Sequence, residues 1–549
     1  MAVHEYASQK EFSRRNFGRG SLGVLALAAL GGPLLTACTP GASGGAGGAQ
    51  AKGTLPDFIR YEGVTPDLKG TDLGIPDVFY RYPAQPVKAL AKAPGDGKAI
   101  TSMVQTSSPI PPGMDKNAYW QELNRRLGSE LQISMTPATD YPSKFATVVA
   151  GDSLPDIFQV ARGANSVPQL LQAKAANLTK HLSGSAIKDY PFLANIPTES
   201  WSAAMFGGEI FAIPIPRGVL QSTIQYRRED LLAEKGITAQ PASFQEYLSL
   251  CKDLSNPKGN TWALTQVPIN FIAQTLNVPN GWREEGGKLT NKDETPEMKE
   301  ALEAGRKMFA DGVVNPDAFA ANAGQYKQWF LAGTAYFTGD AYSAWPAYYQ
   351  QAAGQKGFKI SALDVPGFDG GKGSLWIGSP THSVVAFNKN AGDRLETFLQ
   401  VANWLAAPFG TEEYLFRKYG VQGVHYALSG TDPVPLDTGV GQTQLGQQYL
   451  ADAPTVLYLP GEEAVVKAQY EQMGRVLPDG TASPVEGLYS ETEVRKGSQL
   501  EKKLRSVRDD ILQGRQPVTA WDDAVKEWRS GGGDKIRSEL EEALAASKA

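Results

Sequence analysis

The sequence predicts an α/β fold, because short apolar runs alternate with segments of helical periodicity. Strand patterns at 99–106, 131–135 and 155–160 are separated by helical patterns at 117–127 and 141–150. The order strand, helix, strand, helix, strand implies right-handed βαβ units and a mostly parallel sheet. Ligands bind beyond the carboxyl ends of such strands, so residues 105–108 and 162–165 are candidate binding loops.

A second series of the same kind begins after a hairpin-like run at 208–214. A chain of 549 residues is too long for one hydrophobic core, so we expect more than one domain. After Asp393 the chain is expected to be mainly helical. The elements expected before that point are strands at 222–227, 261–266, 358–364 and 381–388, and helices at 228–235, 243–254 and 296–311.

The stretch from Thr334 to Trp345 combines a strand pattern, a break and a helix start. The apolar run through Phe337 is followed by Gly339 and Asp340, which favour a loop. Pro346 is best tolerated in the first turn of a helix, so we expect a helix near Ser343 with that serine as its N-cap. The loop would present Asp340, Tyr342 and Trp345 to a ligand.

The N-terminal segment predicts export and lipid anchoring. Arg14 and Arg15 form a twin-arginine pair, and the apolar run at 21–35 is too short for a permanent membrane span. Small residues precede Cys38, as in a bacterial lipobox. We therefore expect residues 1–37 to be a signal peptide and Cys38 to be lipidated. Residues 38–98 would then form a flexible Gly/Ala/Ser-rich tether followed by a proline-rich strap on the body.

The composition excludes several classes of function. A net charge of −5 argues against nucleic-acid binding, which favours a basic face. Two cysteines cannot form a disulfide framework, because Cys38 would carry lipid and leave Cys251 alone. The chain has only four histidines, which leaves few side chains to bind a metal. We expect no metal site and no cofactor.

Catalytic motifs are absent or fall in the wrong context. Residues 41–45 spell a nucleophile-elbow pattern, but they lie in the tether without a strand or helix around them. Residues 281–288 lack the Lys-Ser/Thr ending of a phosphate-binding loop. The adjacent pairs Glu284-Glu285 and Asp522-Asp523 are typical of solvated surface, and nothing sets one carboxylate apart as an acid. We therefore expect a protein that is not an enzyme.

Three segments carry a resemblance to a known family. They are 225–237 (QYRREDLLAEKGI), 418–426 (KYGVQGVHY) and 528–537 (WRSGGGDKIR). With the lipobox, the tether and the α/β series, they resemble the extracellular solute-binding lipoproteins of ABC importers. More narrowly, the chain is similar to the large oligosaccharide-importing lipoproteins of the carbohydrate-binding branch related to maltose-binding protein.

The resemblance implies a two-lobed, type II periplasmic-binding-protein-like fold, in which each lobe is a sheet flanked by helices. It implies a first lobe of residues 99–218 plus 335–380 and a second of 219–334 plus 381–549. It also implies a monomer on the outer face of the cytoplasmic membrane that delivers sugar to a permease. Relatives often carry an Asx-rich calcium loop. Here residues 253–260 contain a single Asp together with Pro257 and Lys258, so we expect no ion there.

Sugar sites pair aromatic platforms with a few polar groups, because a sugar has flat C–H faces and a rim of hydroxyls. Trp404, Trp521 and Trp528 lie at helical spacing with other apolar residues and are expected in the core. Lone histidines such as His382 and His425 are more often structural than ligating. The expected ligand-binding residues are Trp345, Tyr342, Asp340, Trp282, Trp376, Trp201, Gln105 and Arg162.

The leading hypothesis is a lipid-anchored receptor that closes two lobes around an oligosaccharide. The alternatives are an extracellular carbohydrate-active enzyme and a cell-wall adhesin. A missing acid–base pair argues against the first alternative, and compaction on adding a small solute would argue against the second.

Overall fold

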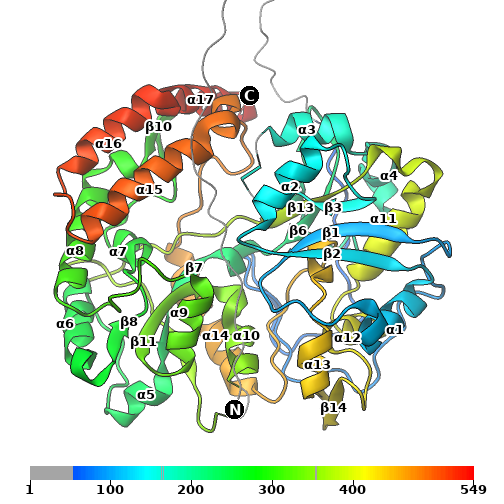
Figure 1. Cartoon of the computed structure of the whole chain (residues 1–549), viewed down its shortest axis with the longest axis horizontal. Coiled ribbons are helices and arrows are strands. Elements are labelled where there is room, and N and C mark those ends of the chain that lie inside the picture. Colours follow the sequence, from blue (N-terminus) through cyan, green and yellow to red (C-terminus); the bar gives the residue numbers. More distant parts are fainter. Residues whose placement is uncertain (1–52, 162, 165, 353–354, 549) are drawn as a thin grey trace, which may run out of the picture. The chain divides into compact units, whose positions relative to one another are not determined.

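The computed structural model describes residues 53–161, 163–164, 166–352 and 355–548 (Figure 1). The predicted signal peptide, Cys38 and most of the tether lie outside these ranges. The described residues, from Gly53 onward, belong to one compact unit that contains two large hydrophobic cores. We call the elements around the core that includes Leu131 the first lobe, and those around the core that includes Phe337 the second lobe.

The first lobe has a five-stranded mixed sheet in the order β2-β1-β3-β13-β6. β1 pairs in parallel with β2 and β3, as the βαβ pattern predicts. β13 lies antiparallel between β3 and β6, so the sheet is not wholly parallel. The strands are β1 (Ile100–Thr106), β2 (Leu131–Pro137), β3 (Ile157–Gln159), β6 (Ile213–Pro216) and β13 (Thr381–Phe387).

Local sequence signals explain the first helix. Asn117 caps α1 by accepting a hydrogen bond from the Trp120 amide at 3.0 Å, and Gly128 ends it in the left-handed conformation that glycine adopts at low cost. The other helices of this lobe cover the sheet or follow β13. The helices are α1 (Ala118–Leu127), α2 (Tyr141–Ala150), α3 (Val167–Lys174), α4 (Thr179–Leu182), α11 (Leu395–Leu405), α12 (Glu412–Tyr419) and α13 (Asp437–Gln442).

Two short hairpins complete the first lobe. They are β4 (Met205–Phe206) with β5 (Glu209–Ile210), and β14 (Tyr426–Ser429) with β15 (Asp432–Pro435). The second hairpin interrupts the mainly helical C-terminal part that the sequence predicts.

The second lobe has a four-stranded sheet in the order β12-β7-β11-β8. β11 pairs antiparallel with β7 and parallel with β8. The strands are β7 (Thr223–Arg228), β8 (Trp262–Leu264), β11 (Ala335–Ala341) and β12 (Ile360–Ala362), and a separate hairpin is formed by β9 (Trp282–Glu285) and β10 (Lys288–Asn291).

Helices surround this sheet, and α15, α16 and α17 gather at one end of the lobe (orange to red in Figure 1). Ser243, expected as the first residue of the helix 243–254, is the N-cap of α6, because its side chain accepts from the Glu246 amide at 3.1 Å. The helices are α5 (Glu229–Glu234), α6 (Phe244–Leu254), α7 (Ile269–Thr275), α8 (Pro296–Ala310), α9 (Ala323–Leu331), α10 (Trp345–Gln351), α14 (Glu463–Val476), α15 (Ser498–Leu512), α16 (Ala520–Trp528) and α17 (Asp534–Lys548).

The predicted division of the chain between the lobes is wrong in two places. Residues 335–380 were expected in the first lobe, but β11 and β12 belong to the sheet of the second. Residues 381–549 were expected in the second lobe, but β13 completes the first-lobe sheet, and the chain stays with that core through Leu450. It returns to the second core at Leu457. Pairing between distant strands decides membership, and the local pattern does not specify the partner.

The expected loop in the 334–345 stretch is also corrected. β11 continues through Gly339 and Asp340 to Ala341, because both residues pair with β7. A short 3-10 turn, η7 (Tyr342–Ala344), leads into α10. Ser343 is therefore not the N-cap, while Pro346 does lie in the first turn of α10, where its missing N–H costs nothing.

Three crossovers join the lobes, at residues 217–222, 376–380 and 451–456. They are bonded to one another: the backbone amides of Arg217 and Gly218 both donate to the Pro380 carbonyl, at 3.0 and 3.1 Å. The Gly378 amide donates to the Ser222 hydroxyl at 2.9 Å. We call these three crossovers the hinge, because segments that join two lobes absorb the change of angle in a hinge motion.

The strap, residues 55–98, is fully described and carries no helix or sheet strand of its own. Isolated bridges join it to the body, among them Val78 with Leu457 and Val87 with Thr411. Phe79 and Tyr82 of the strap pack with Phe409 and Tyr458 in a small aromatic core. The strap thus contacts both lobes as well as the third crossover.

Candidate functional site

The structure places the predicted platforms Trp345 and Tyr342 inside the second-lobe core. Trp345 is 1% exposed and makes an edge contact with Tyr226 at 5.2 Å between ring centroids. The Tyr342 ring is fully buried, and its hydroxyl donates to the Gln472 side chain. Neither ring has an open face for a sugar, so the expectation that they face a cleft is wrong for this structure.

Asp340 is engaged within its own lobe. Its carboxylate accepts from the Tyr348 hydroxyl at 3.2 Å and lies 3.3 Å from the Lys327 ammonium. About a quarter of its side chain is exposed, at the carboxyl end of β11.

The other predicted residues fall in three settings. Trp201 is 1% exposed in the first-lobe core, so it cannot serve as a platform. Trp376, in the second crossover, is half-buried and donates from Nε1 to the Val278 carbonyl at 2.8 Å. Gln105 is half-buried near the carboxyl end of β1, and its backbone amide donates to the side-chain oxygen of Gln159 at 2.9 Å. Arg162 lies outside the described residues.

Trp282 lines a cavity of about 570 Å³ to which both lobes contribute, which we call the interlobe cavity. The first lobe supplies Gly163 and Ala164, which belong to the binding loop predicted after the third strand. The remaining lining comes from the second lobe: Gly281, Trp282, Asn291, Lys292, Asp293, Leu488, Tyr489, Ser490, Glu493, Val494, Gly497, Ser498, Glu501, Trp528 and Ile536.

The interlobe cavity has the chemistry of a saccharide site. Trp282 and Trp528 pack with centroids 6.1 Å apart and are 6% and 8% exposed, so both belong to the second-lobe core, as was expected for Trp528. The small part of each ring that stays exposed borders the cavity. Tyr489 adds a third ring, and its hydroxyl accepts from the Gln169 side chain of α3 at 3.1 Å, a contact between the lobes. Hydroxyl, amide and carboxylate groups stand around the rings. Flat apolar surfaces with a few polar groups suit a sugar.

Sequence reasoning missed Tyr489, Ser490 and Glu493. They lie in the segment between α14 and α15, inside the C-terminal part that is expected to be mainly helical, and no residue of this segment is among the predicted contacts. The only available signal was an aromatic residue in a turn-rich run that includes Pro484 and Gly487. That signal does not say which lobe the residue contacts.

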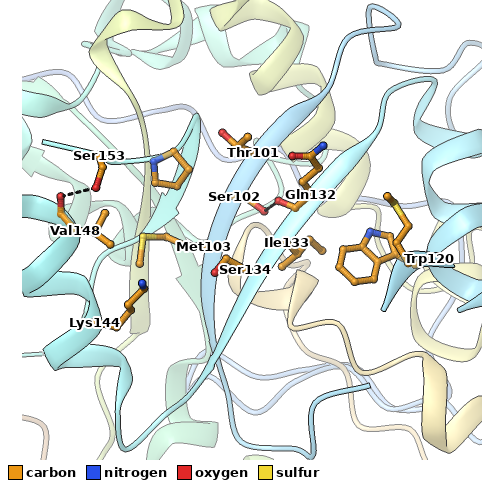
Figure 2. A pocket seen from close by; sticks show the side chains of 12 residues that line it. Thr101, Ser102, Met103, Trp120, Gln132, Ile133, Ser134, Lys144, Val148 and Ser153 are labelled. Atoms are coloured by element: carbon orange, nitrogen blue, oxygen red, sulfur yellow. Dashed lines mark hydrogen bonds between the residues drawn. The ribbon is translucent and has the colours of Figure 1, made fainter. Parts of the chain in front are cut away.

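A second hollow of about 550 Å³ lies on the first lobe between α1 and α2 (Figure 2). Met103 and Ser134 project from the sheet into it, with Trp120 on one side and Lys144 on the other. Its strand residues, 101–103 and 132–134, come from the first halves of β1 and β2. Binding sites of such sheets lie at the carboxyl ends, so this hollow is the weaker candidate.

A cluster of charged side chains is buried beside the hinge. Asp452 of the third crossover lies 2.5 Å from Arg417, 3.2 Å from Arg217 and 3.5 Å from Lys418. Burial alone would raise the pKa of Asp452, but the three cations hold it well below its ordinary value. Desolvation lowers the pKa of Lys418 to about 8, although a third of its side chain is exposed. The cluster ties two crossovers to α12.

Comparison with known proteins agrees with this architecture. Over 512 residues, the chain is 23% identical to the polygalacturonan/rhamnogalacturonan-binding protein YtcQ of Bacillus subtilis (strain 168), covering 89% of this chain and 97% of YtcQ. It is 22% identical to the lipoprotein LipO of the same organism, covering 83% of this chain and 94% of LipO. Both relatives are therefore matched over almost their whole length.

Solved structures support the fold. The crystal structure of the alginate-binding protein AlgQ2 without calcium ion superposes with a TM-score of 0.61 at 15% identity, covering 83% of this chain and 99% of that protein. Residues 118–421, more than half of the 549, match a family described as bacterial extracellular solute-binding protein. With two α/β lobes joined by three crossovers, the chain belongs to the bacterial extracellular solute-binding protein family.

Proposed function

We propose that this protein is the receptor of an ABC importer and captures an oligosaccharide between its lobes. The observation that carries the proposal is the interlobe cavity, where Trp282, Trp528 and Tyr489 stand beside hydroxyl and amide groups and both lobes contribute to the lining. Hinge motion at the crossovers would open and close this space. The names of YtcQ and AlgQ2, which bind polysaccharides, support the same ligand class.

Within this proposal, Trp282 and Tyr489 are the stacking residues. Asp340, Gln105 and Trp376 remain proposed ligand contacts nearer the hinge, and Arg162 remains a proposed contact from the first-lobe loop. The protein would act as a monomer, without catalysis and without a cofactor, and would hand the sugar to a membrane permease. In the part of the chain that the structure describes, no three His, Cys, Asp or Glu side chains are grouped to hold a metal.

A thermal-shift screen of oligosaccharides tests the ligand class. A ligand at about 100 times its dissociation constant adds about 2.7 kcal/mol of stability, so a true ligand raises the melting midpoint clearly. Trp282→Ala is then expected to weaken binding by about 2 kcal/mol, a rise of about 30-fold in dissociation constant, because it removes a buried aromatic anchor. Titration calorimetry well below the melting midpoint gives the number.

Trp201→Ala is the matched control. Both tryptophans are buried, so both variants lose stability, but Trp201 lies in the first-lobe core away from the cavity lining. We expect its affinity to stay within about twofold of wild type. Equal losses of affinity in the two variants would show that the cavity is not the binding site. A screen in which no oligosaccharide raises the midpoint would count against the whole proposal.

We further propose that Cys38 is lipidated after export through the twin-arginine route, which would hold the protein at the outer face of the membrane. The name of LipO supports this. Within the described ranges, no helix is both long and apolar enough to cross a bilayer. Cys38→Ala is expected to move the protein from the membrane fraction to the soluble fraction, because a protein of net negative charge gains nothing from an anionic surface. Firm partitioning of the variant with membranes would refute the anchor.

A further inference from the structure

The charges that line the interlobe cavity are unequal. Among its described lining residues, Lys292 is the one base, whereas Asp293, Glu493 and Glu501 are acids. The Lys292 ammonium is already held by the Asp293 carboxylate, with distances of 2.7 and 2.8 Å to its two oxygens. Asp293 therefore neutralises the one cation of the described lining. The carboxylates of Glu493 and Glu501 remain.

Glu493 is the carboxylate that most affects a ligand. Its side chain keeps an accessible face on the cavity, yet the protein around it desolvates the carboxyl and raises its pKa. Its backbone amide donates to the Ser490 hydroxyl, but no ion pair to its carboxylate is formed by the described residues. Glu501 is compensated weakly, by Arg505 at 3.9 Å.

We infer that the interlobe cavity selects an uncharged oligosaccharide and rejects oligosaccharides of uronic acids. The inference rests on the proposed function and specifies its ligand class. Neutral sugar hydroxyls can donate to Glu493 and Glu501 while the pyranose rings stack on Trp282 and Tyr489. A uronate carboxylate in the same place would face carboxylates of like charge in a partly desolvated site.

This ligand class differs from the one for which two of the similar proteins are named. Polygalacturonan and alginate are polymers of uronic acids, and both are named for relatives of this chain. At 15–23% identity a shared fold does not fix the ligand. A site built for polyuronates would be expected to offer an unpaired arginine or lysine to each carboxylate. The side chains of the described lining whose charge is unpaired or weakly paired are instead negative.

The experiment compares oligosaccharides that differ only at C6. Three pairs are titrated into the full mature protein at pH 7 and low salt. They are galactotriose with trigalacturonate, mannotriose with trimannuronate, and a glucose trimer with its glucuronate counterpart. We expect the neutral member of at least one pair to bind at least tenfold more tightly than its uronate partner. Raising the salt concentration should narrow the ratio, because screening weakens the repulsion.

The outcomes separate this inference from the proposed function. If a uronate binds as tightly as its neutral partner or more tightly, the inference is overturned while the oligosaccharide receptor stands. If no member of any pair binds, the proposed function fails, and the inference fails with it.

A pair of variants tests whether the lining causes the discrimination. Glu493→Gln should reduce the neutral-to-uronate ratio of affinities several-fold. Glu491→Gln removes the same charge from an exposed residue that is paired with Arg495 at 2.7 Å and does not line the cavity, so it should leave the ratio unchanged. Melting curves confirm that both variants are folded. Equal effects of the two substitutions would overturn the assignment to Glu493.

Discussion

Asp452→Asn is expected to lower the free energy of unfolding by about 3–5 kcal/mol, the scale for removing one partner of a buried ion pair. Asp452 is 4% exposed and contacts Arg217, Arg417 and Lys418. An amide has the same size but no charge, so three cations lose their common counter-charge. The largest part of this cost is expected at Arg417, because its side chain has no exposed surface and its Nε already has no hydrogen-bond partner.

Urea denaturation of the wild type and of Asp452→Asn at neutral pH measures the difference in their free energy of unfolding. Asp479→Asn is the control, because the Lys372–Asp479 pair is exposed (74% and 42%) and such pairs contribute about 1 kcal/mol or less. Since the pKa of Asp452 is lowered in the folded protein, its contribution is complete above the unfolded pKa of about 4 and is lost as the pH falls further. The two proteins should therefore converge in strong acid. Equal midpoints at pH 7 would show that the cluster is not a stabilising element.

Trp345→Ala is expected to cost about 3–5 kcal/mol of stability, because it removes a large buried ring from the second-lobe core. Trp345 contacts Tyr226, whose hydroxyl donates to the Ala341 carbonyl at 2.9 Å, so the cavity would open beside the junction of β11 and α10. The fraction that stays folded should bind ligand almost normally, since the ring has no accessible face.

Trp329→Ala on α9 provides the comparison, because its ring is only half-buried and packs at a tilt against Tyr326, with 6.0 Å between the ring centroids. We expect a smaller fall of the melting midpoint than for Trp345→Ala. The decisive measurement is a titration on each variant next to its melting curve. A nearly unchanged midpoint with lost affinity at Trp345 would restore that residue as a binding platform and contradict the core assignment.

Local signals in the sequence predicted individual elements well. The helix 141–150 was predicted with both ends correct, and the predicted third strand, 155–160, contains β3. Such elements are specified by periodicity, by caps such as Asn117 and Ser243, and by glycine stops, all of which act within a few residues. The same reasoning fails where the signal is ambiguous: Gly339 and Asp340 suggest a loop, yet pairing with β7 keeps them in a strand.

The candidate site was predicted only in part. Trp282 and the loop at 163–164 do line the interlobe cavity. A loop after a parallel strand favours a binding edge, whereas Trp282 was expected in a turn-rich loop and is the first residue of β9. Trp345 and Tyr342 have the same composition signal but lie in the core. Whether an aromatic ring faces a cavity or a core depends on what packs against it, and for Tyr342 that partner is Gln472, 130 residues away.

The sequence alone determined the α/β class, the order of most elements and the membership in a solute-binding family, because these depend on periodicity, turn chemistry and motifs within short windows. Tertiary structure alone decided that 335–341 belongs to the second lobe and 381–387 to the first, and that Tyr489 and Glu493 meet Trp282 at one cavity. A strand pattern exposes the same backbone donors and acceptors to any neighbour. The strand with which it pairs depends on how both faces of the sheet are buried, and this involves segments more than 100 residues apart.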